Sequence, residues 1–240
     1  MKNFFRKIIS KFSKYVLIYE NAFDLAKIIK FYNIDLVFDV GASFGGYAKS
    51  LRRFGFKNKI VSFEPIGASH DRLLKNSLED DSWFVHKKII VSDREVKKIS
   101  INVSNDLDNS SLLTSTDLHI KNHHGAKVSF QEEVECDTLD NLTNHYIGKE
   151  KNLMLKIDVQ GSEMSVLKSG IKNLKKFKVV QIELSLQPLY IGQPLWKEII
   201  DFMSKENFGV WAIYPGYKNK SIGQLYQFDA IFYNIAEPNS

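Results

Sequence analysis

A glycine-containing loop near the start of the chain combines residue types that bind nucleosides. The apolar stretch Leu36-Val37-Phe38 runs into Asp39, and a segment typical of a helix starts after the glycines. Glycine lets the backbone approach a ligand closely and adopt positive φ. A strand, a glycine turn and a helix in this order predict a binding loop. The residues of this loop that we expect to contact a cofactor are Asp39, Gly41, Ala42, Gly45 and Tyr47.

An acidic residue, Glu64, follows the next apolar stretch and precedes Pro65. In doubly wound nucleotide-binding folds, a carboxylate at this strand end accepts hydrogen bonds from ribose hydroxyls. The glycine loop alone is also typical of an ordinary tight turn between a strand and a helix. Glu64 therefore favours a nucleoside-binding loop over such a turn.

The spacing of the glycines distinguishes between cofactors. A dinucleotide fingerprint needs a second glycine where this chain has Ser43, so that the pyrophosphate can reach the helix N-terminus. Asp39 would also place negative charge close to that phosphate. The cationic sulfonium and the amino group of S-adenosylmethionine suit this loop better.

Two further carboxylates follow apolar stretches later in the chain, Asp158 after 153–157 and Glu183 at the end of 179–183. In an open α/β sheet, ligands lie beyond the carboxyl ends of the strands, so we expect both to face an acceptor as a general base, an orienting group or a metal ligand. Asp158 could also contact the cofactor. The structural alternatives are a turn or helix cap for Asp158 and a salt bridge for Glu183.

Several other polar residues are candidates for the same site. Glu163 is either a catalytic carboxylate or a partner of its own helix dipole. Asp93 is placed to contact adenine or to form an acidic turn, and Ser110, with Ser111, could cover the cofactor carboxylate. His123 and His124 could supply a base near neutral pH, or could be solvated. The aromatic residues that form either a stacking platform for a sugar or rim packing are Tyr190, Trp196, Trp211, Tyr214, Tyr217 and Tyr226.

Short β-rich stretches alternate with helical patterns from residue 36 onward, which predicts an α/β fold with a doubly wound, mostly parallel seven-stranded sheet. The predicted strands are 36–40, 59–63, 83–91, 153–157, 179–183, 209–213 and 228–233. The predicted helices are 46–54, 68–79, 163–177 and 195–207.

One segment, about 98–137, interrupts this alternation. It contains an alternating apolar and polar stretch at 100–103, a polar stretch at 104–111 and a second alternating stretch at 128–136. Alternation with a period of two is typical of strands with one solvated face. We therefore expect a small β insert with a polar loop, of the kind that often covers a substrate.

The charge distribution bears on partners and location. The chain carries 33 basic and 28 acidic residues, and five basic residues precede the first acidic one, so the remainder is neutral and a nucleic-acid groove is not expected. Residues 1–16 form a basic amphipathic pattern that suits either an anionic membrane surface or packing on the domain. The lone Cys136 excludes an internal disulfide. We expect a cytoplasmic protein, with peripheral contact at the inner membrane face as the alternative.

Three further segments carry a resemblance to a known family. They are Val134-Glu135-Cys136-Asp137-Thr138-Leu139-Asp140, Lys156-Ile157-Asp158-Val159-Gln160-Gly161-Ser162-Glu163 and Ile182-Glu183-Leu184-Ser185. With the glycine loop and Glu64, they resemble the FkbM family of S-adenosylmethionine-dependent methyltransferases over about 34–235. The resemblance implies a Rossmann-like class I methyltransferase fold. The family usually has an acidic residue at the position of Gln160, so a divalent metal ligand at this position is in doubt.

The leading hypothesis is an S-adenosylmethionine-dependent O-methyltransferase that acts on a hydroxyl of a sugar, a glycan or another hydroxylated small molecule. A cofactor-binding scaffold without turnover is one alternative, and a dinucleotide-dependent oxidoreductase is another. A divalent metal is left open. We predict a division into an N-terminal helical segment, 1–33, and a methyltransferase domain, 34–240.

Overall fold

The structure, a computed structural model, describes residues 24–236 of the 240-residue chain. The predicted amphipathic segment at 1–16 lies outside the described residues. A helix over 24–31 begins the described part and buries Leu25, Ile28 and Ile29 against the sheet. The predicted domain boundary after residue 33 stays a prediction. No helix within 24–236 is long and apolar enough to cross a membrane.

A seven-stranded sheet forms the centre of the molecule, in the order β3-β2-β1-β7-β8-β10-β9. Its first five members in this order are parallel, whereas β10 runs antiparallel to both β8 and β9. The predicted doubly wound, mostly parallel sheet is therefore confirmed. The strands are β1 (Leu36–Val40), β2 (Lys59–Phe63), β3 (Trp83–Val85), β7 (Leu153–Ile157), β8 (Phe177–Ser185), β9 (Phe208–Pro215) and β10 (Gln227–Asn234).

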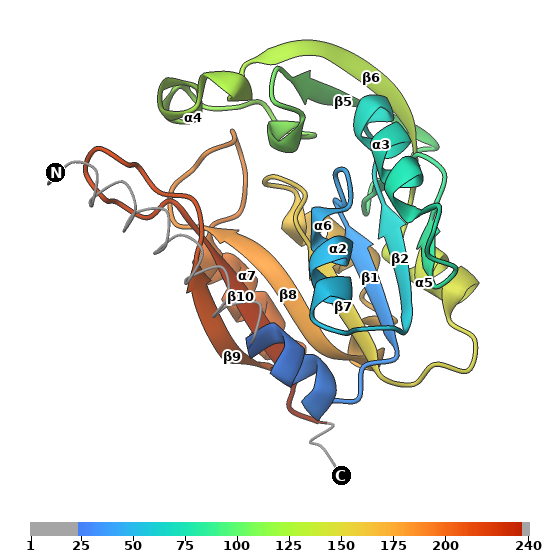
Figure 1. Cartoon of the computed structure of the whole chain (residues 1–240). Helices are drawn as coiled ribbons and strands as arrows, with labels where there is room; N and C mark the ends of the chain where they lie inside the picture. The colour runs from blue at the N-terminus through green and yellow to red at the C-terminus, as the bar shows by residue number, and fades with distance from the viewer. Residues whose placement is uncertain (1–23, 237–240) are drawn as a thin grey trace, which may run out of the picture.

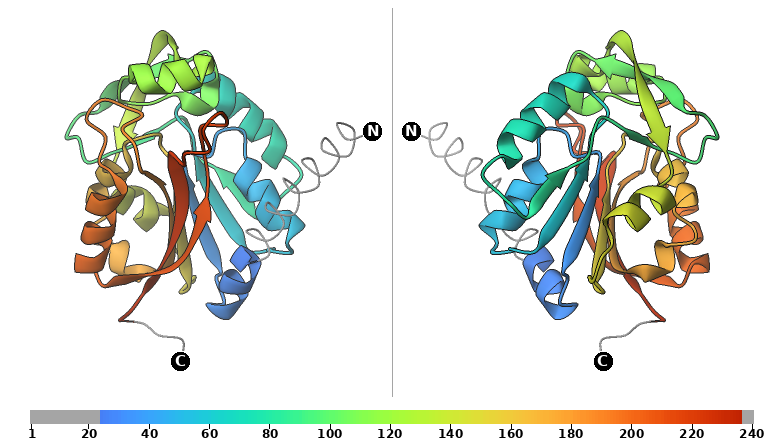
Figure 2. Two further views of the ribbon diagram at one scale, coloured as in Figure 1. Left: turned by 90° about the vertical axis from the view of Figure 1, so that its left-hand side faces the viewer. Right: turned by 90° about the vertical axis from the view of Figure 1, so that its right-hand side faces the viewer.

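Helices cover both faces of this sheet (Figure 2). One face carries the 24–31 helix, α2 (Gly46–Arg53) and α3 (Gly67–Ser77). The other carries α5 (Leu139–Tyr146), α6 (Glu163–Ser169) and α7 (Trp196–Lys205).

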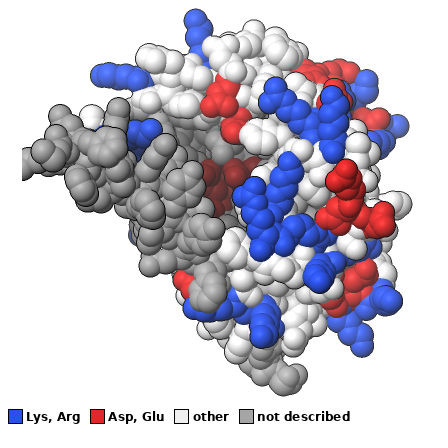
Figure 3. Space-filling view, viewed as in Figure 1, with Lys and Arg blue, Asp and Glu red and all other residues white. Residues whose placement is uncertain are grey.

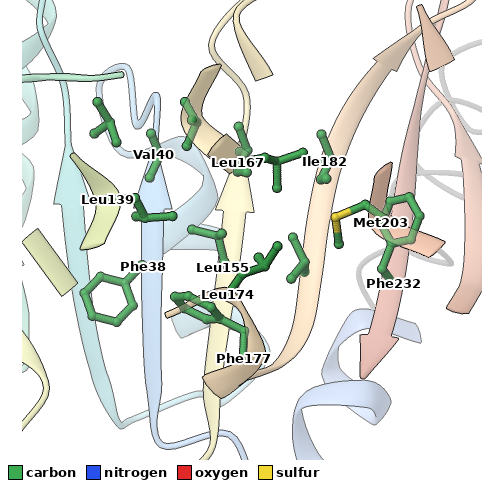
Figure 4. Close-up of a cluster of buried hydrophobic side chains, with 14 of the residues drawn as sticks. Phe38, Val40, Leu139, Leu155, Leu167, Leu174, Phe177, Ile182, Met203 and Phe232 are labelled. Carbon is green, nitrogen blue, oxygen red and sulfur yellow. The ribbon is translucent and has the colours of Figure 1, made fainter. Parts of the chain in front are cut away.

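The central strands β1, β2 and β7 are mostly apolar because they are buried on both sides. Successive side chains of a strand point to opposite faces, so Phe38 and Val40 join one core cluster while Val37 joins the other. Figure 4 shows the first cluster, in which Leu155 and Met203 also pack. Two tightly packed layers of this kind hold the carboxyl ends of the central strands in fixed positions.

The insert forms a second sheet that lies across the carboxyl ends of the central strands (Figure 1). Strands β5 (Lys98–Ser104) and β6 (Val128–Asp137) pair antiparallel, which confirms the predicted hairpin-like element. The segment between them contains short helices that sequence analysis did not predict. They are η1 (Leu107–Asn109), α4 (Asp117–Asn122) and η2 (His124–Ala126).

Two predicted elements differ in extent from the observed ones. The predicted strand 83–91 is wrong as one element, because β3 pairs with β2 whereas β4 (Ile90–Val91) pairs with β6 in the second sheet. Lys87 and Lys88 lie exposed between them and form ion pairs with Glu135 and Glu132. The predicted helix 163–177 ends at residue 169, and η3 (Leu174–Lys176) follows before β8.

Candidate active site

A cavity of about 580 Å³ lies beneath the insert, at the carboxyl ends of β1, β2, β7 and β8. Figure 3 shows acidic side chains deep in a hollow on this side of the molecule. Six carboxylates and one ammonium line the cavity: Glu64, Asp106, Asp108, Asp158, Glu183, Asp229 and Lys156. The sheet thus brings the predicted Glu64, Asp158 and Glu183 into one site.

The glycine loop passes unusually close to the strand end of β7. Gly41 has a φ of +78°, and a Cβ there would lie 1.8 Å from the carbonyl oxygen of Asp158. The backbone N–H groups of Gly41 and Ala42 both donate to the carbonyl oxygen of Phe63, at 3.1 Å. Gly41 therefore permits a close approach between two backbone segments at the floor of the cavity.

The other predicted loop residues have different surroundings. Gly45 has a φ of +88° and faces Trp83, which a Cβ would approach to 2.5 Å, so it serves packing and does not line the cavity. Ala42 and Tyr47 do line the cavity. The hydroxyl of Tyr47 donates to Gln181 at 2.9 Å. This hydrogen bond therefore holds Tyr47 in a fixed orientation in the cavity wall.

Glu64 lies at the end of β2 and is 5% exposed. Its Oε2 accepts from the backbone N–H of Ser43 at 2.8 Å, and its Oε1 accepts from that of Ile66 at 2.9 Å. Burial raises the pKa of Glu64 to about 7, although these hydrogen bonds oppose the shift. Each carboxylate oxygen has two acceptor sites, so Glu64 retains one on each oxygen for a ligand hydroxyl.

Lys156 lies between two acidic side chains and is 7% exposed. Its Nζ is 3.5 Å from Asp39 Oδ1 and 3.4 Å from Asp158 Oδ2, and it donates to the carbonyl oxygen of Gly41 at 3.1 Å. Burial by itself lowers the pKa of Lys156, but the charges of Asp158 and Asp39 raise it above its usual value. This lysine was not among the predicted site residues, although it begins the segment 156–163 that carries part of the family resemblance.

Asp39 is fully buried beneath the loop and does not line the cavity. Its Oδ1 has no hydrogen-bond partner among the described residues, and Ser62 donates to Oδ2 at 3.4 Å. Burial raises the pKa of Asp39, and the nearby Lys156 opposes the shift. Asp39 thus acts on the site through Lys156 and through its own charge.

Gln160 connects the two carboxylates at the ends of β7 and β8. Its Nε2 donates to Asp158 Oδ1 at 2.8 Å and to Glu183 Oε2 at 3.0 Å. Its Oε1 accepts from the hydroxyl of Tyr190 at 2.9 Å. Gln227 also donates to Glu183 Oε2, at 2.7 Å. Burial and the charge of Asp158 raise the pKa of Glu183 well above its usual value.

A divalent cation does not fit this set of donors. The amide group of Gln160 donates to one oxygen each of Asp158 and Glu183, so it fills the position between the two carboxylates where a shared cation would have to lie. Among residues 24–236, no group of three or more His, Cys, Asp or Glu side chains is placed to hold a metal ion. The neutral amide of Gln160 therefore bridges the carboxylates of Asp158 and Glu183.

Asp229 is a cavity residue that sequence analysis missed. It stands opposite Glu183 in the antiparallel register of β10 and β8, and its Oδ1 accepts from Gln181 at 3.4 Å. Burial and Asp158 raise its pKa to about 6. An acidic residue in the otherwise apolar stretch 228–233 was the available signal.

Other predicted residues lie at the edge of the site or outside it. Ser110 and His123 line the cavity, but Glu163, Asp93 and His124 do not. The carboxylate of Glu163 accepts from the backbone N–H of Gly161 at 2.9 Å, and burial raises its pKa to about 7. Asp93 accepts a hydrogen bond from the Ser165 hydroxyl.

The strand order, the glycine loop and the strand-end carboxylates define a Rossmann-like methyltransferase fold. The chain belongs to the FkbM methyltransferase family, because the family model described as the methyltransferase FkbM domain matches residues 39–210 of its sequence. It is accordingly an S-adenosylmethionine-dependent methyltransferase, and this assignment replaces the oxidoreductase alternative.

The individual proteins that the chain resembles share at most a quarter of their aligned residues with it. The chain is 25% identical over 186 residues to the 2-O-methyltransferase NoeI of Sinorhizobium fredii, which covers 75% of this chain and 74% of that protein. An rRNA methylase from Streptococcus thermophilus has a TM-score of 0.49 at 10% identity and covers 91% of this chain and 96% of its own. Magnesium protoporphyrin IX methyltransferase from Synechocystis PCC 6803, with bound S-adenosylmethionine, has a TM-score of 0.48 at 10% identity, with coverages of 91% and 80%.

Proposed function

We propose that the enzyme transfers a methyl group to a hydroxyl oxygen of a sugar, a glycan or another hydroxylated small molecule. The observation that carries this proposal is the position of Asp158, which lines the cavity within reach of both the glycine loop and Glu183. The related NoeI is named a 2-O-methyltransferase, which supports oxygen as the acceptor atom.

The residues on the β1 and β2 side fit S-adenosylmethionine. Gly41, Ala42 and Tyr47 line the cavity, and Glu64 has free acceptor sites for two ribose hydroxyls. The buried negative charge of Asp39 suits a cation nearby. When bound, the cofactor supplies an electrophilic methyl group on a sulfonium. Ser110 faces the same space from the insert.

Asp158 and Glu183 take different roles because their surroundings differ. Asp158 pairs with the ammonium of Lys156, so it is the carboxylate suited to accept the proton of the acceptor hydroxyl. Burial and the charge of Asp158 raise the pKa of Glu183, which favours its protonated form, and a protonated carboxyl can donate a hydrogen bond that orients the acceptor. Two carboxylates in different surroundings are a recurrent way to divide such work. Glu163 supports the loop 158–161 from behind.

Calorimetry and methyl transfer test this proposal together. We expect the purified protein to bind S-adenosylhomocysteine but not a nicotinamide dinucleotide. Label from S-adenosylmethionine should then appear as an alkali-stable ether on an acceptor in a glycan or glycolipid extract. Binding without transfer to any extract would favour a cofactor-binding scaffold, and label on nitrogen or carbon would contradict O-methylation.

Contact with a membrane surface is a separate proposal for residues 1–16. Its support is the basic and amphipathic sequence pattern, with Lys2, Arg6, Lys7, Lys11 and Lys14 on or near one side. Co-sedimentation of the full chain with vesicles that contain phosphatidylglycerol tests it, with pure phosphatidylcholine vesicles as the control. Equal sedimentation with both would contradict an electrostatic contact.

A further inference from the structure

One wall of the cavity is formed by helix α4 and the β9–β10 connection, and the segment after β8 packs behind this wall. Helix α4 of the insert is held to the segment after β8, since the backbone N–H of Thr116 donates to the carbonyl oxygen of Leu189 at 2.8 Å. The same helix is held to the β9–β10 connection, since Asn219 donates to Asn122 at 2.7 Å. This wall therefore belongs to the folded domain and is not a loose loop.

His119 of α4 presents an unsatisfied nitrogen in this wall. The residue is 2% exposed and lines the cavity, and its Nδ1 has no hydrogen-bond partner among the described residues. Its ring stands edge-on to Tyr190, with 5.0 Å between the centroids. Burial and the nearby His123 lower the pKa of His119 to about 4. The imidazole is therefore neutral at physiological pH.

Tyr217, in the β9–β10 connection, presents a second unsatisfied group. Its hydroxyl is buried and has no partner among residues 24–236, and the residue lines the same cavity. The ring lies between Tyr226 and His119, with centroid distances of 5.7 Å and 6.3 Å. A buried polar group without a partner is unfavourable, so two of them in one cavity wall indicate a ligand that completes them.

A hydroxyl group matches this pair. It can donate to an imidazole nitrogen and accept from a phenol at the same time, so a single hydroxyl can satisfy both groups. The aromatic ring of Tyr217 adds apolar surface of the kind on which a sugar ring packs. The wall is thus chemically suited to a polyhydroxylated ring.

The charge of the cavity excludes anionic acceptors. Lys156 is the one Lys or Arg side chain among the described lining residues, and it already contacts Asp39 and Asp158. Asp106 lies beside the subsite, and its Oδ2 is 3.0 Å from His123 Nε2. A phosphate brought into this space would meet uncompensated negative charge at short range.

We propose that His119 and Tyr217 form a specificity subsite, which binds a second, non-reacting hydroxyl of a neutral polyhydroxylated acceptor and disfavours phosphorylated ones. This inference rests on the proposed O-methyl transfer. The subsite is connected to the reacting groups, because Tyr190 packs against His119 and donates through its hydroxyl to Gln160. An acceptor held there would present a neighbouring hydroxyl to Asp158.

The test uses the full chain saturated with S-adenosylhomocysteine and a panel of methyl hexopyranosides, with binding measured by saturation-transfer NMR and titration. The critical variant is Tyr217→Phe, which removes only the unsatisfied hydroxyl. The matched control is Tyr226→Phe, because Tyr226 belongs to the same aromatic cluster but does not line the cavity, and its hydroxyl already accepts from Asn219 at 3.1 Å.

We expect Tyr217→Phe to weaken the best pyranoside about tenfold, as for loss of one hydrogen bond to a buried group, and Tyr226→Phe to change it less than twofold. His119→Asn keeps a polar atom near the position of Nδ1 and should bind better than His119→Phe. The 6-phosphate of the best pyranoside should bind at least tenfold more weakly than its neutral parent.

The inference is overturned if Tyr217→Phe binds the pyranoside like wild type, if the phosphate binds as well as its parent, or if no pyranoside binds a protein that does bind S-adenosylhomocysteine. The last result would leave methyl transfer itself intact. Failure of S-adenosylhomocysteine to bind would instead contradict the proposed function.

Discussion

The two ends of the cavity satisfy their polar groups in different ways. At the glycine-loop end, Glu64 already accepts from the backbone N–H groups of Ser43 and Ile66. At the insert end, His119 and Tyr217 present buried polar atoms without partners. The carboxylate of Glu64 is therefore held by the backbone, whereas the polar atoms of His119 and Tyr217 have no protein partner among residues 24–236. The comparison suggests that cofactor binding depends on backbone geometry, and acceptor binding on individual side chains.

The largest effect is expected where the two ends meet, at Asp158. We expect Asp158→Asn to reduce the rate of methyl transfer about 10²- to 10⁴-fold, because the amide cannot accept the hydroxyl proton. The affinity for S-adenosylhomocysteine should change less than threefold, since the amide keeps the size of the side chain. Initial rates and calorimetry on the same preparation measure both. Normal turnover in this variant would show that another group removes the proton.

Gly41→Ala tests whether the cofactor end depends on backbone approach. The new Cβ would lie 1.8 Å from the carbonyl oxygen of Asp158, so β1 and β7 would have to separate locally. Gly55→Ala is the matched control, because Gly55 has a similar φ of +87° but nothing within 4 Å of an added Cβ. Left-handed strain alone costs about 1–2 kcal/mol.

We expect urea unfolding to show a cost of about 1–2 kcal/mol for Gly55→Ala and at least about 2 kcal/mol more for Gly41→Ala. Gly41→Ala should also lose measurable affinity for S-adenosylhomocysteine. Equal costs in the two variants would mean that the loop relaxes freely, and the backbone-held description of this end would be wrong.

Glu64→Ala tests the side-chain part of the cofactor end. We expect S-adenosylhomocysteine to bind more weakly by about 1.5–3 kcal/mol, as for hydrogen bonds to a charged group. The pKa of Glu64 is raised to about 7, so its acceptor capacity, and with it the affinity, should fall as the pH is lowered through 7. Calorimetry between pH 6 and 8.5 measures this dependence. In Glu64→Gln, the affinity should not change over the same pH range. An unchanged affinity in Glu64→Ala would contradict ribose binding by this carboxylate.

Glu163 allows a test by stability rather than by binding. Its pKa is raised from 4.5 to about 7, so the folded state holds the proton more tightly than the unfolded state. The stability that this carboxyl contributes is therefore complete below about pH 4.5 and is lost as the pH rises through 7. His119, whose pKa is lowered, contributes with the opposite sign between about pH 4 and 6.5. Because His119 is present in both proteins, the difference between wild type and Glu163→Gln gives the contribution of Glu163 alone.

Between pH 5 and 7.5, we expect Glu163→Gln to lose about 2 kcal/mol less unfolding free energy than wild type. Denaturant titrations at the two pH values measure the difference. Parallel pH profiles in the two proteins would show that the buried carboxyl does not titrate in this range, and a loss of turnover with normal stability would support a direct catalytic role.

The cofactor end could be predicted from the sequence because its signals are local. The strand 36–40, the glycine turn and Glu64 each carry their own chemistry within a few residues. Asp229 was missed because only the antiparallel register of β10 places it opposite Glu183. Lys156 was missed because the direction of its side chain depends on burial against Tyr47 and Asp39.

The acceptor end could not be assembled from sequence for the same physical reason. In the sequence, Tyr217 could be identified only as one of several aromatic residues. His119 was not identified at all, because nothing local distinguishes it from His123 and His124. Their proximity depends on packing between the insert and the β9–β10 connection, which are far apart in the chain. Sequence patterns report such long-range contacts poorly.

The smallest effects separate two residues that were both predicted to contact the cofactor. Ser110 lines the cavity, and its hydroxyl accepts from the backbone N–H of Ser104 at 3.1 Å. Asp93 lies outside the cavity and accepts from Ser165. Ser110→Ala leaves a backbone donor unsatisfied at the rim, so we expect S-adenosylhomocysteine to bind more weakly by about 1 kcal/mol. For Asp93→Asn we expect less than a twofold change in calorimetry. A larger loss of affinity in Asp93→Asn than in Ser110→Ala would instead place the adenine near β4, and the cofactor would then lie away from the insert.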